Sequence, residues 1–254
     1  MTPAVAALIA AGLLALAVLH RRHRAGLKAA RRRLFDPVLP LLDSYRITQD
    51  AVAHPVLEGR YRGRRIRLEP VVDQLTFRKL PSLWLLVTVF GAVPWRGSFD
   101  LLMRAQNTEF WSPAAGFDHA VTLPAGWPPE ASLRTDDPAA MPPQHLLERH
   151  VRLFADPAMK ELLVTPKGVR LVYLLDQAER GTYLVLRQAR FAEAPMPADL
   201  ARALLEAALA LLQDLGAKDP GAKDLGAKDL GAKDLGAGDG EGPAGAAGEP
   251  QPGG

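Results

Sequence analysis

The chain has 254 residues, no cysteine and a formal net charge of +3. The absence of cysteine excludes disulfides, thiolate catalysis and cysteine-based zinc or iron–sulfur centres. The positive charge is concentrated in residues 1–33, which hold seven Lys and Arg and no acid, whereas residues 34–213 are neutral and residues 214–254 are acidic. A neutral middle segment argues against nucleic-acid binding, which requires a basic face on the domain itself.

The N-terminal segment is an apolar run followed by a basic one. Residues 3–19 (PAVAALIAAGLLALAVL) contain no charged side chain, and as a helix they would span about 25 Å, the short end of what crosses a bilayer. The basic segment, here called the collar, contributes Arg21, Arg22, Arg24, Lys28, Arg31, Arg32 and Arg33. Because positive residues beside a span stay in the cytosol, we expect the N-terminus outside and everything after His20 inside.

Two alternatives remain open for this segment. A cleaved signal peptide is one, since Ala15-Leu16-Ala17 resembles a cleavage site, although no basic residue precedes the apolar run. An interfacial or soluble helix is the other. If the segment is an anchor, its collar sets the topology and is also predicted to contact anionic lipid headgroups. The Ala-, Gly-, Pro- and Arg-rich composition is typical of a GC-rich bacterium, so the expected location is a bacterial inner membrane.

The next pattern predicts a β-hairpin. Val56–Tyr61 and Arg64–Val71 flank Arg62-Gly63, which suits a two-residue turn. That turn pairs Tyr61 with Arg64 and Arg60 with Arg65, and it sorts apolar side chains onto one face and charged ones onto the other. A half-buried antiparallel hairpin requires this separation.

The charged face of the hairpin carries Arg60, Arg65 and Arg67. Arginines directly opposite each other repel, and Glu58 and Glu69 lie close enough in sequence to offset this on a solvated edge. The functional alternative is an anion site, for a lipid headgroup or a phosphate, formed by the three arginines.

The remaining pattern predicts an antiparallel α+β domain over residues 34–213, ending in a helix. In chain order we expect a central strand at Leu83–Phe90, a returning strand at Ser98–Arg104, extended pieces at His119–Leu123 and Ala131–Thr135, a helix at His145–Phe154, a hairpin of Lys160–Thr165 with Val169–Leu175, a strand at Thr182–Phe191 and a helix at Pro197–Leu215. Residues 214–254 repeat GAKD and are rich in Gly, which predicts a disordered tail.

No motif identifies a catalytic, metal or cofactor site. Neither a phosphate-binding GxxxxGK[ST] loop nor a G-x-S-x-G elbow occurs. His145 and His150 are five residues apart and would point in different directions on a helix. Adjacent Asp118 and His119 would face opposite sides of a strand. We therefore expect no catalytic residue, no metal and no cofactor.

Three stretches resemble a group of bacterial single-pass membrane proteins that carry a cytosolic α+β domain without an assigned function. They are G-x-Y-x-G-R at Gly59–Arg64, RKLPSLWLLVTV at Arg78–Val89 and KELLVTPKGVRLV at Lys160–Val172. The resemblance implies the same architecture and supplies no catalytic residues.

Our first interpretation is a membrane-anchored, non-enzymatic interaction or accessory domain at the cytosolic face, with membrane lipid and a protein as partners. One alternative is a protein that responds to anionic lipid or phosphate through the collar and the arginine hairpin. A second alternative is an enzyme whose site is assembled from scattered residues such as Asp118, His119, His145 and Glu148.

Overall fold

The computed structural model describes residues 2–74, 80–106, 109–142 and 144–216. The described residues belong to one compact unit. The GAKD repeats beyond residue 216, predicted to be disordered, lie outside the described residues.

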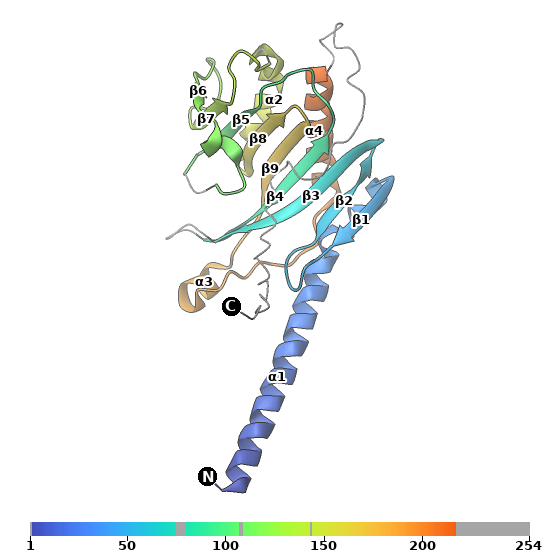
Figure 1. Ribbon diagram of the computed structural model, residues 1–254, viewed down its shortest axis with the longest axis vertical. Helices are drawn as coiled ribbons and strands as arrows, with labels where there is room; N and C mark the ends of the chain where they lie inside the picture. Colours follow the sequence, from blue (N-terminus) through green and yellow to red (C-terminus); the bar gives the residue numbers. More distant parts are fainter. Residues whose placement is uncertain (1, 75–79, 107–108, 143, 217–254) are drawn as a thin grey trace, which may run out of the picture. The chain divides into compact units, whose positions relative to one another are not determined.

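Nine antiparallel strands of the described residues form one sheet in the order β1-β2-β3-β4-β9-β8-β5-β7-β6 (Figure 1). The strands are β1 (Ser44–Thr48), β2 (Val56–Tyr61), β3 (Arg64–Asp73), β4 (Ser82–Phe90), β5 (Phe99–Met103), β6 (His119–Val121), β7 (Ala131–Thr135), β8 (Met159–Thr165) and β9 (Gly168–Gln177). The helices are α1 (Pro3–Arg32), α2 (Glu148–Val151), α3 (Arg180–Leu186) and α4 (Ala198–Gly216), with short 3-10 turns at Arg33–Phe35, Leu39–Leu41, Pro113–Gly116, Gln144–Leu146 and Arg152–Ala155. The predicted α+β fold, with an N-terminal apolar helix and a C-terminal helix, is confirmed.

α1 is long and apolar enough to cross a membrane by length and composition. Its most apolar window has a mean hydropathy of 2.2, and none of that window is buried inside the protein. Pro3 stands at the first helical position, where its missing N–H costs no hydrogen bond. An exposed apolar helix of this kind is expected to bury its surface in lipid.

The β2–β3 hairpin has the predicted register. Tyr61 pairs with Arg64 and Arg60 with Arg65 across the Arg62-Gly63 turn. Leu57, Ile66 and Leu68 on one face are fully buried, while Arg60 and Arg65 on the other are exposed. The alternation of apolar and charged residues therefore predicted both the pairing and the buried face.

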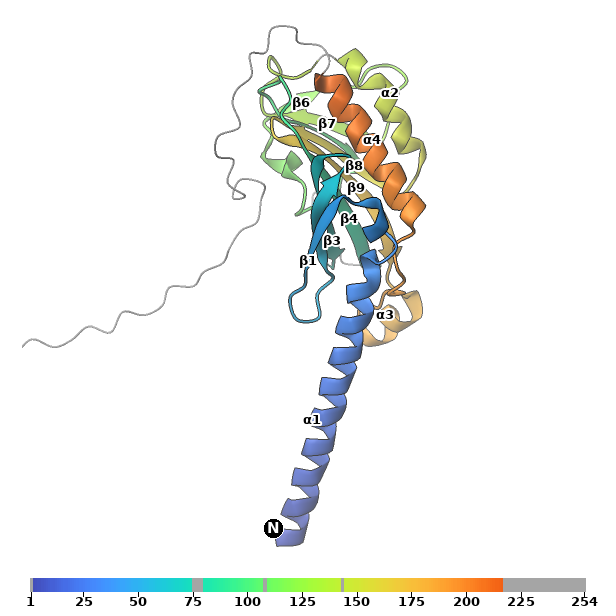
Figure 2. The ribbon, with the colours of Figure 1, turned by 90° about the vertical axis from the view of Figure 1, so that its right-hand side faces the viewer.

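The core lies between the sheet and α4, which packs against β4 and β9. β4 occupies the central position expected from its sequence, between β3 and β9. On α4 the buried positions recur at helical spacing, at Ala201, Leu204, Leu205, Ala208, Leu209, Leu211, Leu212 and Leu215. Figure 2 shows α4 and α2 on the same side of the sheet.

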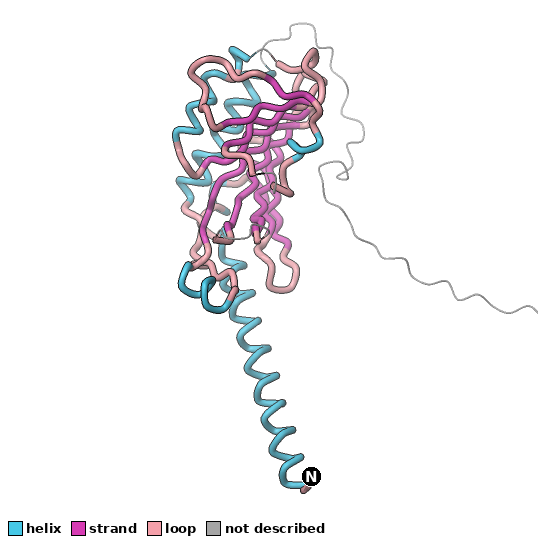
Figure 3. The backbone as a smooth tube through the Cα atoms, turned by 90° about the vertical axis from the view of Figure 1, so that its left-hand side faces the viewer, coloured by secondary structure: helices cyan, strands magenta, loops and turns pink. Residues whose placement is uncertain are grey.

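The opposite face of the sheet is covered by the connection between β5 and β6. Trp111 of this connection stacks on Trp84 of β4, with ring centroids 5.5 Å apart, and packs with Leu86 and Val172. Figure 3 shows this loop-rich cover on the side of the sheet away from α4. β4 is thus fully buried on the face toward α4 and covered in part on the other, where Leu86 is buried and Trp84 half-buried, which explains its largely apolar sequence.

The strand expected at Ser98–Arg104 is present as β5, but it does not lie beside the central strand β4. β5 pairs with β8 and β7 and makes no ladder with β4. The edge of β4 is instead filled by β9, which pairs with it from Ser82 to Phe90. A ladder of that length offers more hydrogen bonds than five-residue β5 could, so the β8–β9 hairpin is inserted between β4 and β5.

Two further predicted elements differ. Residues 182–191, expected as a strand, form α3 and an extended segment, because both edges of the preceding strand β9 are already occupied by β4 and β8. The expected single helix at His145–Phe154 is three short pieces, Gln144–Leu146, Glu148–Val151 and Arg152–Ala155.

Gly168 opens β9 with φ of 151°, and a Cβ there would lie closer than 3.0 Å to the Val89 carbonyl oxygen. Gly168→Ala is therefore expected to lower the free energy of unfolding by about 1–3 kcal/mol. Urea denaturation of the full-length chain in detergent, followed by tryptophan fluorescence, measures it. Gly116→Ala, where a Cβ meets nothing within 4 Å, is the control. Equal stability of the two variants would contradict the account.

Candidate functional site

The end of α1 is fastened to the domain by one arginine. Arg31 donates to Glu193 Oε1 through its Nε at 2.8 Å and to the Val52 carbonyl at 2.6 Å. Both partners of the ion pair are largely shielded, with side chains 14% and 17% exposed. We call this cluster, made up of Arg31, Val52, His54 and Glu193, the junction. It connects α1 to segments 21 and 162 residues away.

The backbone around the junction leaves no free linker between helix and domain. Leu34 and Phe35 directly follow α1 and are buried in the main core. The Leu34 carbonyl accepts a hydrogen bond from the Met196 N–H at 2.7 Å. Gln49 donates to the Lys28 carbonyl, inside α1, at 3.1 Å. The domain therefore begins where the helix ends.

His54 lies behind the ion pair as a neutral group. It is 7% exposed, and its ring meets Phe191 edge to face at 6.0 Å. Burial, and secondarily the positive charge of Arg31, lowers the pKa of His54 to about 4. Its Nε2 lies 3.5 Å from Glu193 Oε2. With the imidazole uncharged, the Glu193 carboxylate is left to neutralise Arg31.

Two junction segments adopt an unusual backbone. Ala51, in the β1–β2 loop, has φ of 42°, and Glu193 has φ of 53°. The left-handed conformation costs a non-glycine residue on the order of 1 kcal/mol. Such conformations persist where surrounding contacts hold them, and both residues flank the contacts to Arg31.

The other predicted lipid-contacting residues lie on the surface. Arg21, Arg22, Arg24, Lys28, Arg32 and Arg33 are exposed. Arg33 lies 3.7 Å from Asp36. Their contact with headgroups stays a prediction. Arg31 differs because its guanidinium is engaged by the domain, a role that the run of basic residues gave no means to foresee.

The hairpin arginines each have a local contact. Arg60 donates to the Gly63 carbonyl at 3.0 Å, and the Arg65 guanidinium lies 4.0 Å from the centroid of the Phe90 ring. Arg67 pairs with Glu58 at 3.1 Å and Glu69 at 3.0 Å.

The hairpin turn lies at the far end of β2 from the β1–β2 loop that contacts α1, since that loop precedes Val56 and the turn follows Tyr61. Arg60 and Arg65 do face each other, as expected. Their binding of an anion stays a prediction.

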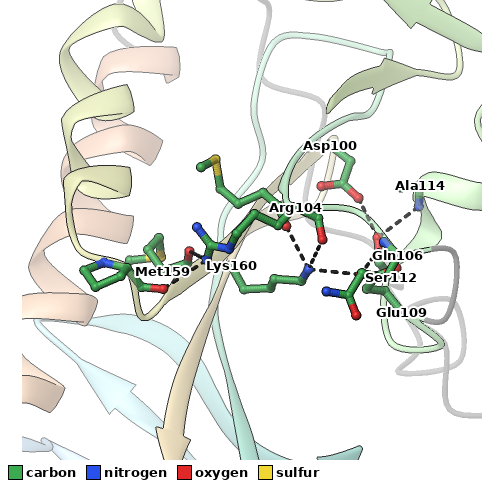
Figure 4. A network of polar contacts seen from close by, with 10 residues as sticks. Asp100, Arg104, Gln106, Glu109, Ser112, Ala114, Met159 and Lys160 are labelled. Carbon is green, nitrogen blue, oxygen red and sulfur yellow. Dashed lines mark hydrogen bonds and ion pairs between the residues drawn. The ribbon is translucent and has the colours of Figure 1, made fainter. Parts of the chain in front are cut away.

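A buried polar network holds the loop after β5 over the sheet (Figure 4). Lys160, only 4% exposed, donates to the carbonyls of Met103 at 2.7 Å and Arg104 at 2.9 Å and to Glu109 at 2.9 Å. Buried charge needs such complete pairing to be tolerated. The network pins the loop to β8.

Beside it, three charged side chains from β5, β8 and β9 lie on one face of the sheet. Asp100 and Arg170 both pair with Leu163 of β8, and Glu161 lies two residues before Leu163. Asp100 and Glu161 are fully buried, and Arg170 lies 3.5 Å from Glu161. Burial, and then the neighbouring Glu161, raises the pKa of Asp100 well above its usual value. Ser112 donates to Asp100 at 2.6 Å. Asp100 and Glu161 are thus enclosed together. In the sequence, this buried pair is visible only as a single acidic residue within each of two apolar strands, β5 and β8.

A surface pocket of about 240 Å³ lies between α2 and α4. His150 Nε2 lies 2.7 Å from Asp214, which also accepts from Arg149 at 3.2 Å. Burial lowers the pKa of His150, although Asp214 acts in the opposite sense. Arg152 completes the polar lining over an apolar floor.

The residues considered for an enzymatic site do not converge. Asp118 and His119 are exposed at β6, and His145 and Glu148 are exposed near α2. Within the described residues, no three His, Asp or Glu side chains gather as they would around a metal ion.

Comparison with known proteins adds one structural likeness. No protein-family model matches the chain, and no curated protein matches its sequence. The crystal structure of the mycobacterial trehalose monomycolate transport factor A, TtfA, aligns over 75% of this chain and 94% of its own, with 10% identity and a TM-score of 0.38. At that score the likeness carries no argument about function.

The His54 pKa predicts how stability depends on pH. Between pH 6.5 and about 4 the unfolded chain binds a proton that the folded chain does not, so stability falls as the pH drops through this range. The full effect is roughly 3 kcal/mol. Denaturation at pH 7 and pH 4.5 measures the difference, and His54→Gln should reduce it. His119→Gln, at an exposed site, should leave it unchanged. An undiminished pH effect in His54→Gln would contradict this account.

Proposed function

We propose that this protein is a membrane-anchored accessory protein whose α+β domain binds a protein partner at the cytosolic face of a bacterial inner membrane. The observation that carries the proposal is the junction. Arg31, Glu193 and the buried Leu34 and Phe35 fix the domain to the anchor helix. A fixed mount suits a protein that presents one surface to a neighbour in the membrane, because it removes the entropy cost of orienting that surface.

The orientation belongs to the same proposal. The collar follows the apolar run, and no basic side chain precedes it. This asymmetry supports an N-terminus outside and a cytosolic domain.

The chemistry of the domain supports binding over catalysis. Asp100, Glu161 and the Lys160 network are buried, and the Arg170 side chain beside Glu161 is only 16% exposed. The pocket between α2 and α4, at about 240 Å³, is smaller than the roughly 300–1,000 Å³ of usual ligand sites.

A partner surface is available at one edge of the sheet. β1 is the first strand in the sheet order and pairs with β2 alone among the described strands. Its Tyr45 side chain is 53% exposed. An uncovered edge strand offers unpaired backbone groups to an added strand, a common mode of peptide recognition.

A second candidate function is a response to anionic lipid or phosphate. It is favoured by the six exposed basic side chains of the collar and by Arg60 facing Arg65 on the hairpin. Each basic residue near acidic headgroups is worth on the order of 1 kcal/mol.

The partner proposal is tested by photo-crosslinking the full-length chain in its native membrane. A benzophenone amino acid replacing Tyr45 should yield a defined protein adduct. The same group replacing Phe110, which is also 53% exposed, is the matched control. A flexible insertion between Arg32 and Arg33 should reduce the Tyr45 adduct severalfold, since it frees the domain from its mount. An insertion of equal length after Gly238 should not.

The proposal fails if Tyr45 gives no adduct, or if both positions give the same set of adducts. If the Tyr45 adduct persists after the insertion between Arg32 and Arg33, the partner binds without a fixed orientation of the domain on α1. That result would contradict the role given to the junction.

A further inference from the structure

The helix α3 exposes three consecutive apolar side chains. Leu184, Val185 and Leu186 are 57%, 79% and 60% exposed. Beyond α1, the other large apolar side chains exposed in the described part of the chain are single aromatic residues, Tyr45 and Phe110. A contiguous patch of this kind costs solvation free energy and marks a surface that is covered in use.

The patch is bordered mainly by positive charge, and the exposed acid directly before α3, Glu179, accepts a hydrogen bond from Thr182. Arg180, Arg187 and Arg190 are exposed around α3. The Arg187 guanidinium lies 5.8 Å from the centroid of the Tyr183 ring. Apolar side chains flanked by arginine and tyrosine have the composition of segments that lie in the interfacial layer of a membrane.

The segment carrying α3 is closed at its base and tied to the junction. The Glu179 N–H donates to the Arg190 carbonyl, and the Ala192 N–H donates to the Asp176 carboxylate, both at 2.8 Å. Phe191 is buried against Leu83 and Ala178. Two residues after Phe191, Glu193 forms the ion pair with Arg31 of α1. The position of α3 is therefore set relative to the anchor helix.

The topology puts α3 at the end of the sheet that receives α1. Asp73 of β3, Ser82 of β4 and Gln177 of β9 pair in one row, so α3 follows directly at this end. The β1–β2 loop, which contacts Arg31, closes the neighbouring strands at the same end. Figures 1 and 2 both show α3 extending past the sheet at the level of the collar.

The distances along α1 suit this placement. About 18 Å of helix separate Leu19, the last apolar residue of the run, from Arg31. The interfacial layer occupies about 5–8 Å of that length, and helix tilt shortens the remainder. Figures 1 and 2 show α3 beyond the end of the sheet and beside the upper part of α1, on the side toward the apolar run.

We propose that α3 is a second membrane contact, with Leu184, Val185 and Leu186 inserted into the interfacial layer of the bilayer and Arg180, Arg187 and Arg190 on anionic headgroups. This rests on the proposed function in one respect, that α1 crosses the membrane. A bilayer is favoured over a protein partner because the patch lies at the anchored end and its border is basic. Two membrane contacts, at α1 and at α3, restrict the tilt of the domain relative to the bilayer.

The test uses single cysteines, which the natural chain lacks, in the full-length protein in nanodiscs of phosphatidylcholine and phosphatidylglycerol. A polarity-sensitive fluorophore on Val185→Cys is expected to shift to the blue and to be quenched by nitroxide lipids. Ala92→Cys, exposed beyond the opposite end of β4, is the control and should show neither change. Leu184→Ser with Leu186→Ser should abolish quenching at the Val185 label.

A label on Leu14→Cys reports whether α1 is in the bilayer. Quenching at Leu14 without quenching at Val185 would overturn the role of α3 and leave the anchor intact. No quenching at either position would overturn the anchor as well. Protection of the Val185 label in native membranes, but not in lipid-only nanodiscs, would assign the patch to a protein partner and overturn the proposal.

Discussion

The ion pair between Arg31 and Glu193 fixes the position of the α+β domain at the end of α1. Each charge is largely shielded from water, so removing one partner would leave the other desolvated and unpaired, at a cost of about 1–3 kcal/mol. Neutral His54 and the Val52 carbonyl complete the surroundings. A single membrane helix followed by a loop would permit free rotation of the domain. Here α1 ends at Arg32, and Leu34 and Phe35 just after it are buried in the core. The direction of α1 is therefore fixed relative to the sheet.

The rest of the architecture follows from that constraint. The strand ends nearest α1 bear the β1–β2 loop and α3, which face the collar, while the hairpin turn with Arg60 and Arg65 lies at the other end. Two buried hydrogen bonds hold the loop that covers the second face of the sheet. Lys160 donates to the Met103 carbonyl, and Ser112 donates to Asp100. These enclosed side chains stabilise the cover of the sheet, and the surfaces left for contacts include the β1 edge, α3 and the collar.

Local patterns predicted what local interactions determine. The register of the β2–β3 hairpin, from Leu57 opposite Leu68 to Tyr61 opposite Arg64, followed from two-residue alternation and one Gly turn. The α4 helix followed from its apolar spacing. Prediction failed where distant segments compete. The neighbour of β4 was not predicted, because the distant strand β9 pairs with it. Residues 182–191, expected as a strand, begin within α3, because both edges of β9 are already occupied by β4 and β8. Glu193 carried no signal, since its partner lies 162 residues earlier.

The central claim is that the domain is rigidly mounted on α1, and a distance distribution tests it most directly. Nitroxide labels on Ala25→Cys in α1 and Glu148→Cys in α2, both exposed, can be measured by double electron–electron resonance in nanodiscs without interfering native cysteines. The account predicts one narrow distance distribution that broadens when Arg31→Ala and Glu193→Ala are introduced together. A broad distribution in the chain with an intact junction would contradict it.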